Sequence, residues 1–235
     1  MLTISDTETI NHLMEERTLN KLFKRTGILM LILMMLAFAA ACGSTQTSSD
    51  SEPSEDIEES MPEAQPAENG IGIHHAEIEI QDYGTIALEL DGDTAPITVQ
   101  NFMDLANAGF YDGLTFHRIM DGFMIQGGDP LGNGMGGSDH NIKGEFDMNG
   151  VRNDISHVKG VISMARAQDP DSGSSQFFIT VADSEFLDGQ YAAFGHVTSG
   201  QDVADKIAAD AQPLDDNGTI APEDQPVITT VRIID

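Results

Sequence analysis

The chain has 235 residues with 39 acidic and 11 basic side chains, and its formal net charge at pH 7 is -28. Such an acidic chain repels phosphate backbones, which argues against nucleic-acid binding. The simplest interpretation of the negative charge is a soluble, well-solvated surface. The single cysteine, Cys42, excludes an intrachain disulfide and a zinc site built from cysteines.

The first apolar segment has the features of a secretory signal. It runs from Ile28 to Ala41 and follows three basic residues, Lys21, Lys24 and Arg25. The run is shorter than the roughly 20 residues that a membrane-spanning helix needs, and it ends in small residues. We therefore expect residues 1–41 to be a signal peptide, with Met14 as an alternative start that would leave a shorter leader.

Cys42 directly follows this run, after Ala39, Ala40 and Ala41. Small residues followed by cysteine resemble the lipobox of bacterial lipoproteins, in which the cysteine is lipidated and becomes the new N-terminus. That family more often has leucine where this chain has Ala39, and an ordinary signal peptide with a chance cysteine is the alternative. The resemblance implies an exported protein, held by lipid on Cys42 at the outer face of the bacterial cytoplasmic membrane.

The next segment, residues 43–74, is rich in Ser, Thr, Glu, Gln and Pro. With few large apolar groups and many like charges, it cannot bury enough surface to offset its chain entropy. Together with the lipidated cysteine, residues 42–74 are expected to be an acidic, disordered tether. The adjacent His74 and His75 at its end are interpreted as polar loop residues.

From residue 75 to residue 235 the pattern is that of one folded domain. Apolar and polar residues alternate over Ala76–Ile80 and Thr85–Leu90, and the turn-like stretch between them predicts a β-hairpin. Pro96 then opens a predicted helix, because proline is tolerated in the first turn, and Gly109 ends it. Four apolar residues recur at helical spacing and predict a core-facing side: Val99, Phe102, Met103 and Ala106.

The rest of the domain alternates short strands with turns. A second amphipathic helix is expected over Gln201–Ala209, and strands are expected over Thr115–Ile119, Met124–Gln126, Val161–Ala165, Phe177–Val181, Ala193–Val197 and Val227–Ile234. This pattern indicates a mainly β fold, a closed antiparallel eight-stranded β-barrel capped by two α-helices. Because the chain has no Trp, its core must be built from Phe, Ile, Leu, Val and Met.

The stretch from Phe116 to Asp129 is the most informative part of the chain. It brings Arg118 close to the large apolar Phe123 and Met124 and to Gln126, with no strong nucleophile among them. Such a surface fits an apolar ring and directs a fixed cation at the amide beside it. Rotation about an X-Pro peptide bond needs only these groups.

This stretch resembles the signature of the cyclophilin family of peptidyl-prolyl isomerases. The resemblance covers about residues 76–235. Further segments support it in the same order along the chain: Val161–Ala165, Gly173–Ile179, and Phe186–Gly189 running on to Phe194–Val197. Any one of these segments alone would be a weak signal, whereas their order makes the resemblance specific.

The resemblance implies a role for each site residue. Arg118 is expected to be catalytic, and Gln126 to steady it and to hydrogen-bond the substrate backbone. The pocket for the proline ring is expected to consist of Phe123, Met124 and Phe178, closed by Leu187. The other expected substrate-binding residues are Ala165 and Gln176 for residues before the proline, Gly134 at the rim, Arg166 chiefly through its backbone, and Phe186 and Tyr191 in the pocket wall.

The chemistry of the amide bond supports a catalytic arginine independently of the family resemblance. An amide resists rotation by about 18–20 kcal/mol because its nitrogen shares a lone pair with the carbonyl. In the twisted transition state the lone pair localises on the proline nitrogen, so a guanidinium aimed there binds that state better than the planar ground state. No metal or cofactor is required. The glycine-rich Gly132–Gly137 lacks the Lys-Ser/Thr of a phosphate loop, and Asp169–Gly173 lacks the Glu of a calcium loop.

Three positions depart from the best-studied eukaryotic pattern: Phe186 stands for a tryptophan, Tyr191 for a histidine and Arg166 for an asparagine. Phenylalanine has no indole N–H, so the resemblance implies weak cyclosporin binding with catalysis retained.

The sequence therefore predicts an isomerase, expected to be a monomer, that acts on proline-containing segments of unfolded or exported proteins. Two alternatives stay open. One is a module of the same fold that binds proline peptides or acts as a chaperone without catalysis, and the other is a structural surface protein that uses the acidic tether for spacing. The intact set of Arg118, Phe123, Met124 and Gln126 favours catalysis.

Overall fold

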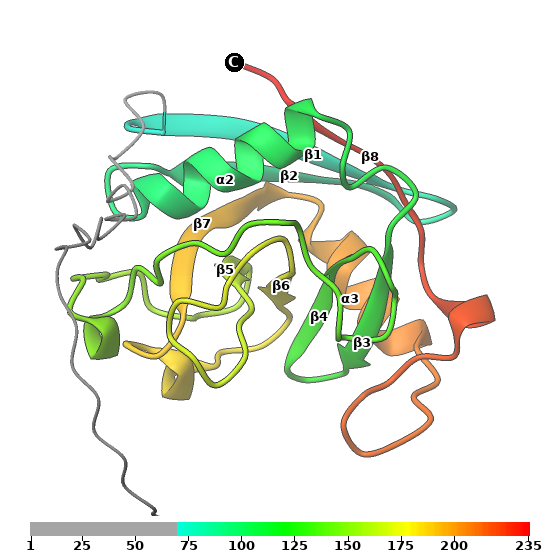
Figure 1. Ribbon diagram of the computed structural model, residues 1–235. Helices are drawn as coiled ribbons and strands as arrows, with labels where there is room; N and C mark the ends of the chain where they lie inside the picture. The colour runs from blue at the N-terminus through cyan, green and yellow to red at the C-terminus, as the bar shows by residue number, and fades with distance from the viewer. Residues whose placement is uncertain (1–69) are drawn as a thin grey trace, which may run out of the picture. The chain divides into compact units, whose positions relative to one another are not determined.

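The computed structural model describes residues 70–235, and Figure 1 shows how their helices and strands are arranged. The predicted signal peptide, Cys42 and most of the predicted tether lie outside these residues. The strands are β1 (Ile73–Ile80), β2 (Gly84–Asp91), β3 (Thr115–Met120), β4 (Met124–Asp129), β5 (Val161–Met164), β6 (Phe177–Thr180), β7 (Ala192–Ser199) and β8 (Ile228–Ile233). The helices are α2 (Pro96–Asn107) and α3 (Gln201–Asp210), with short 3-10 helices η1 (Asp147–Asn149), η2 (Glu185–Leu187) and η3 (Pro222–Asp224). None of the helices in this part of the chain is long and apolar enough to cross a membrane.

The strands form one antiparallel sheet in the order β3-β4-β6-β5-β7-β2-β1-β8. The predicted hairpin is present as β1 and β2. β1 begins at Ile73, three residues before the predicted start, because the ladder to β2 continues through the pairs Ile73–Asp91 and His74–Leu90. His74 and His75 therefore lie in a strand, and the prediction that they belong to a loop is wrong.

The sheet is an open half-barrel, so the prediction of a closed barrel is wrong. β3 and β8 stand at its two edges, and an isolated bridge joins Thr115 of β3 to Val227, the residue before β8. Pro226, next to that bridge, has no N–H with which to continue a ladder. The loop before β8 lies along the rest of β3, where the N–H of Ile119 donates to the carbonyl of Gly218 at 2.8 Å. Loop backbone therefore satisfies edge groups that a closing strand would have paired.

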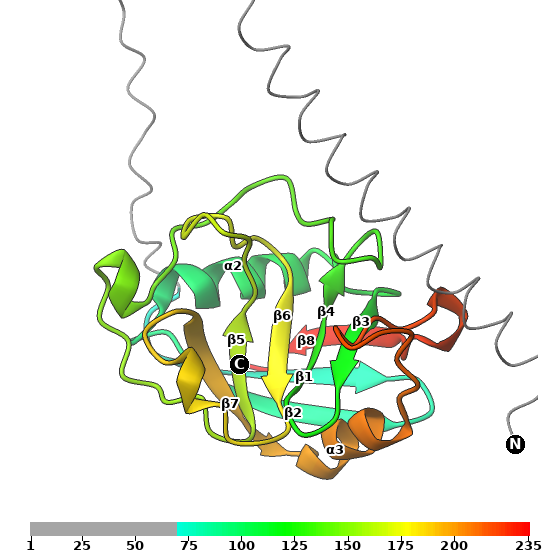
Figure 2. The same cartoon turned by 90° about the horizontal axis from the view of Figure 1, so that it is seen from below.

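The two helices lie near opposite ends of the strands β3 to β6 (Figure 2). The predicted apolar side of α2 is buried as expected. No side chain of its own cap satisfies the first turn of α2, and the buried carboxylate of Glu145 does so instead. It accepts hydrogen bonds from the backbone N–H of Ile97 at 3.1 Å and of Thr98 at 2.8 Å. This contact joins the helix to the long connection between β4 and β5.

Strands β3 to β6 bury apolar side chains on both faces. One face belongs to the main core, with residues such as Ile119, Ile125, Phe177 and Ile179. Because side chains alternate along a strand, the neighbouring residues point the other way. There a separate small cluster forms from Met124, Phe178 and Leu187. This second cluster is the floor of the site described next.

Candidate active site

A row of side chains crosses four paired strands on the face opposite the main core. Arg118 of β3 pairs with Gln126 of β4, Gln126 pairs with Phe178 of β6, and Phe178 pairs with Ser163 of β5. Directly opposed residues in an antiparallel sheet have Cβ atoms about 4.5–5.5 Å apart. The strand register alone therefore brings these residues together, although they are far apart in the sequence.

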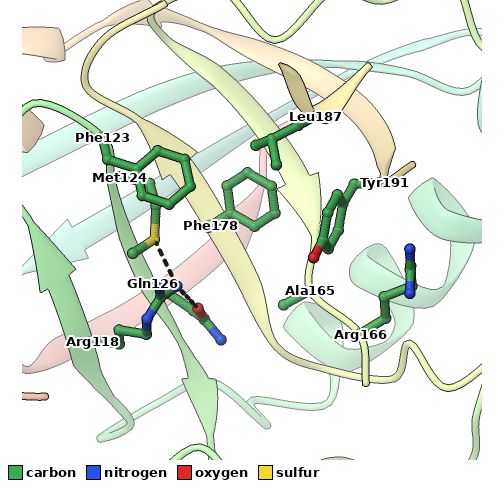
Figure 3. A pocket seen from close by; sticks show the side chains of 9 residues that line it. All are labelled: Arg118, Phe123, Met124, Gln126, Ala165, Arg166, Phe178, Leu187 and Tyr191. Carbon is green, nitrogen blue, oxygen red and sulfur yellow. Dashed lines mark hydrogen bonds between the residues drawn. The ribbon is translucent and has the colours of Figure 1, made fainter. Parts of the chain in front are cut away.

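A cavity of about 210 Å³ opens beside this row (Figure 3). Nine of the predicted site residues line it: Arg118, Phe123, Met124, Gln126, Ala165, Arg166, Phe178, Leu187 and Tyr191. Met124, Phe178 and Leu187 are buried and supply an apolar floor. The predicted catalytic arginine and the predicted ring pocket thus form one cavity.

The guanidinium of Arg118 is fixed at the wall of this cavity. Its Nη1 donates to Oε1 of Gln126 at 3.1 Å, and its Nε donates to the carbonyl of Asn217 at 2.8 Å. The Cζ atom lies 6.0 Å from the centre of the Phe123 ring. Burial lowers the pKa of Arg118, while Tyr191 and Asp215 raise it. An arginine stays protonated in proteins despite such shifts, so the cavity holds a permanent, oriented cation.

A chain of amide hydrogen bonds supports Gln126. Because its oxygen accepts from Arg118, its amide nitrogen is free to donate, and it donates to Oε1 of Gln176 at 2.9 Å. Gln176 in turn donates to the carbonyl oxygens of Gly136 at 2.7 Å and Gly134 at 3.2 Å. The orientation of the arginine is therefore linked to the glycine-rich loop after β4.

A second cavity of about 380 Å³ adjoins the first and shares Gln126, Ala165 and Arg166 with it. Gly134 and Gln176, which were predicted to bind substrate, line this second cavity and not the first. The two adjoining cavities are together called the groove below.

Phe186 is the predicted site residue that lines neither cavity. Neighbouring residues of the 3-10 helix η2 face different sides, so Leu187 points into the site while Phe186 is 65% exposed. The Phe186 ring packs against Phe123 with a centroid distance of 5.5 Å. Tyr191 does wall the pocket, and its ring is nearly perpendicular to that of Phe178, with the ring centres 5.8 Å apart.

Three residues that were not predicted to belong to the site lie behind the pocket. The ring of His157 stacks on Phe178 with a centroid distance of 6.1 Å, and its Nδ1 lies 2.8 Å from Oδ1 of Asp188. A carboxylate can only accept, so Nδ1 carries the proton and the neutral ring accepts at Nε2 from the Ser163 hydroxyl, 3.0 Å away. Burial lowers the pKa of His157, and Asp188 opposes that effect.

No local sequence signal could have found this group. His157 and Asp188 are 31 residues apart and belong to no common motif. Ser163 was placed correctly in a strand, but nothing in the pattern distinguished it from its apolar neighbours. Only the pairing of β5 with β6 brings Ser163 beside Phe178.

Comparisons with known proteins agree with this geometry. The family model for "Cyclophilin type peptidyl-prolyl cis-trans isomerase/CLD" matches residues 75–234. Peptidyl-prolyl cis-trans isomerase A of Dickeya dadantii is 50% identical over 132 residues, which cover 53% of this chain and 66% of that protein. A peptidyl-prolyl cis-trans isomerase of Helicobacter pylori is 49% identical over 126 residues, which cover 53% of this chain and 74% of that protein.

Solved structures lead to the same family. The crystal structure of a cyclophilin type peptidyl-prolyl cis-trans isomerase of Cryptosporidium parvum matches with a TM-score of 0.62 and 29% identity, covering 70% of this chain and 99% of that one. The same protein solved in the presence of the dipeptide Ala-Pro matches with a TM-score of 0.60 and 28% identity, covering 68% of this chain and 99% of that one. With a family model that spans most of its length, the chain belongs to the cyclophilin-type peptidyl-prolyl cis-trans isomerases.

Proposed function

We propose that this peptidyl-prolyl cis-trans isomerase acts on proline-containing segments of exported, unfolded proteins, and that lipid on Cys42 holds it at the outer face of the cytoplasmic membrane. One observation gives the strongest support for catalysis by Arg118. The guanidinium of Arg118 lies at the wall of a cavity whose floor is apolar.

The cavity suits a proline ring. Phe123, Met124 and Phe178 offer the ring apolar contact, and burial of apolar surface favours its entry. In this placement the peptide nitrogen of the proline faces the arginine side of the cavity. The solved relative in the presence of Ala-Pro supports a proline-containing peptide as the ligand class.

Catalysis then follows from differential binding. With the ring held, the carbonyl on the other side of the X-Pro bond rotates. The lone pair that leaves conjugation localises on the proline nitrogen, and an Arg118 N–H stabilises it there. The planar ground state offers no such lone pair, so the interaction is strongest in the twisted state. Gln126 keeps the guanidinium in place, and the step needs no proton transfer.

The membrane proposal rests on the N-terminal sequence. Cys42 is the one cysteine of the chain and follows three alanines after a short apolar run. An acidic protein is repelled by anionic lipid headgroups, so its own charge would not hold it at a membrane. Two acyl chains on a lipidated cysteine give stable attachment, with about 0.8 kcal/mol for each buried CH₂. The acidic segment between Cys42 and β1 would then space the domain from the bilayer.

A foldase at this location has a clear use. Unaided X-Pro isomerisation takes tens to hundreds of seconds, which is slow enough to limit folding. Exported proteins fold after translocation, so they meet the enzyme while their X-Pro bonds are still accessible. We propose that the enzyme works as a monomer, because the groove is completed by residues of one chain.

The anchor is tested with the full chain expressed in a bacterial host. Membrane and soluble fractions are separated, and the N-terminal peptide is analysed by mass spectrometry. We expect a mature terminus at Cys42 carrying lipid, in the membrane fraction. Cys42→Ser is the matched variant and should retain its leader or appear as soluble exported protein. A mature terminus elsewhere, or an unmodified Cys42, would contradict the anchor and leave the isomerase mechanism intact.

A further inference from the structure

The groove carries only positive charge, although the chain is strongly acidic. The charged residues that line its two cavities are Arg118 and Arg166. Among the described residues, no Asp or Glu lines either cavity. In a chain with 39 acids and 11 bases, an acid-free groove with two arginines is a local reversal of charge.

Ion pairing sets these arginines apart from most other cations of residues 70–235. Four of the cations pair with carboxylates: Arg152 with Asp154, Lys159 with Asp205, Lys206 with Asp210, and Arg232 with Glu79. Within the described part of the chain, Arg118, Arg166 and Lys143 have no carboxylate oxygen within 4.0 Å. Lys143 lies outside both cavities, so the unneutralised charge of the groove comes from the arginines.

Arg166 is held rigidly where the two cavities meet. Its guanidinium lies between the rings of Phe146 and Tyr191, with its Cζ atom 5.0 Å and 4.8 Å from their centres. Nε and Nη2 donate to the carbonyl of Gln190 at 3.0 and 2.8 Å, and Nη1 donates to that of Ala167 at 2.9 Å. These neutral acceptors orient the group without cancelling its charge. Nη1 also lies 3.5 Å from the carbonyl of Gln168, so an N–H of Nη2 remains to donate to a ligand.

We propose that Arg166 makes this isomerase selective for an acidic side chain within two residues before the proline. The proposal rests on the placement of the proline ring in the first cavity, as described above. An extended peptide advances about 3.3 Å per residue. The residues next to the proline therefore pass the border formed by Gln126, Ala165 and Arg166 on their way into the second cavity. A carboxylate there forms charge-assisted hydrogen bonds with the guanidinium.

The acidic remainder of the domain does not cancel this preference. Charges farther away than about 8 Å are largely screened at physiological ionic strength, whereas a partly buried contact is screened much less. The preference should therefore survive at physiological salt. Long-range repulsion of acidic peptides would act mainly at low ionic strength.

The test uses proline peptides that carry Glu, Gln or Lys at the first or the second position before the proline. We expect kcat/KM for Glu to exceed that for Gln about fivefold at one of these positions, and Lys to be the poorest there. Equal kcat/KM values for Glu and Gln at both positions would overturn the proposed selectivity but leave the isomerase mechanism intact. Absence of turnover with every peptide would overturn the proposed mechanism as well.

Substitutions of Arg166 test whether its side chain causes the preference for Glu. Arg166→Gln should remove the Glu-over-Gln ratio, and Arg166→Lys should keep part of it because the charge remains. Since both peptides are measured on the same variant, any general loss from disturbed packing of Tyr191 cancels in the ratio. Arg152→Gln removes one positive charge outside the groove and should leave the ratio unchanged. A ratio that persists in Arg166→Gln would contradict the assignment.

Discussion

Arg118 and Gln126 are paired across β3 and β4, and Nη1 of the arginine donates to Oε1 of the glutamine at 3.1 Å. The side-chain oxygen of Gln126 therefore accepts from the arginine, while its amide nitrogen donates to Gln176. Gln176 in turn donates to carbonyl oxygens of the glycine-rich loop. The arginine is therefore oriented from one side by its neighbouring strand and from the other by the carbonyl of Asn217.

Gln126→Ala should lower kcat/KM about 10- to 100-fold on a proline peptide. The reason is the loss of a hydrogen bond to a charged group, about 1.5–3 kcal/mol, at a guanidinium whose position matters for the transition state. The measurement is an isomerisation assay with circular dichroism to confirm the fold. Gln81→Ala, in the exposed turn between β1 and β2, is the control and should behave as wild type. Equal activity of the two variants would show that Gln126 does not position the arginine.

His157 should make folding stability depend on pH. Burial lowers its pKa in the folded protein below the ordinary value of 6.5, against the opposing effect of Asp188. As pH falls through about 6.5, the unfolded chain takes up this proton before the folded protein does. Stability is therefore present above that pH and is lost as pH falls below it.

The measurement is urea unfolding between about pH 5 and pH 7.5, on wild type and on His157→Asn. The variant should be less stable at pH 7 and should lose less stability on acidification. Some slope should remain, because burial also lowers the pKa of His117. His196→Asn, at an exposed histidine, is the control. An unchanged slope in His157→Asn would mean that the burial of His157 does not cause the pH dependence.

Phe186→Trp should strengthen cyclosporin binding relative to the wild type. The family resemblance implies an indole N–H as a donor to this inhibitor, and the exposed position of Phe186 leaves room for the larger ring. Titration calorimetry with both proteins measures the change. Tight binding by the wild type would show that the donor is not needed here.

The site was largely predictable because its residues lie in strands whose alternation is visible in the sequence. Met124, Phe178 and Leu187 fall within or beside apolar runs, and the polar Gln126 interrupts one of them. Once the strands were placed, the resemblance assigned each side chain to the groove. Phe186 is the exception, because the rotation of a 3-10 helix decides which neighbour faces the cavity.

The remaining features depend on contacts between distant segments. The sheet stays open because loop backbone, with Pro226, occupies the edge of β3, and no strand pattern shows where a loop will lie. Glu145 caps α2 from a residue 47 positions away, and its local sequence resembles any exposed acid. His157 and Asp188 are joined in the same way, through tertiary packing alone.

The central claim is that Arg118 catalyses the rotation, and Arg118→Ala tests it most directly. Removing one fixed transition-state donor should lower kcat/KM about 10²–10³-fold on a proline peptide. The fold should survive, since Arg118 is only partly buried and makes no ion pair in residues 70–235. Peptide binding, followed by line broadening in NMR spectra, should persist while exchange between the cis and trans forms slows. Near-wild-type exchange in a folded Arg118→Ala protein would contradict the account and favour a proline-binding module.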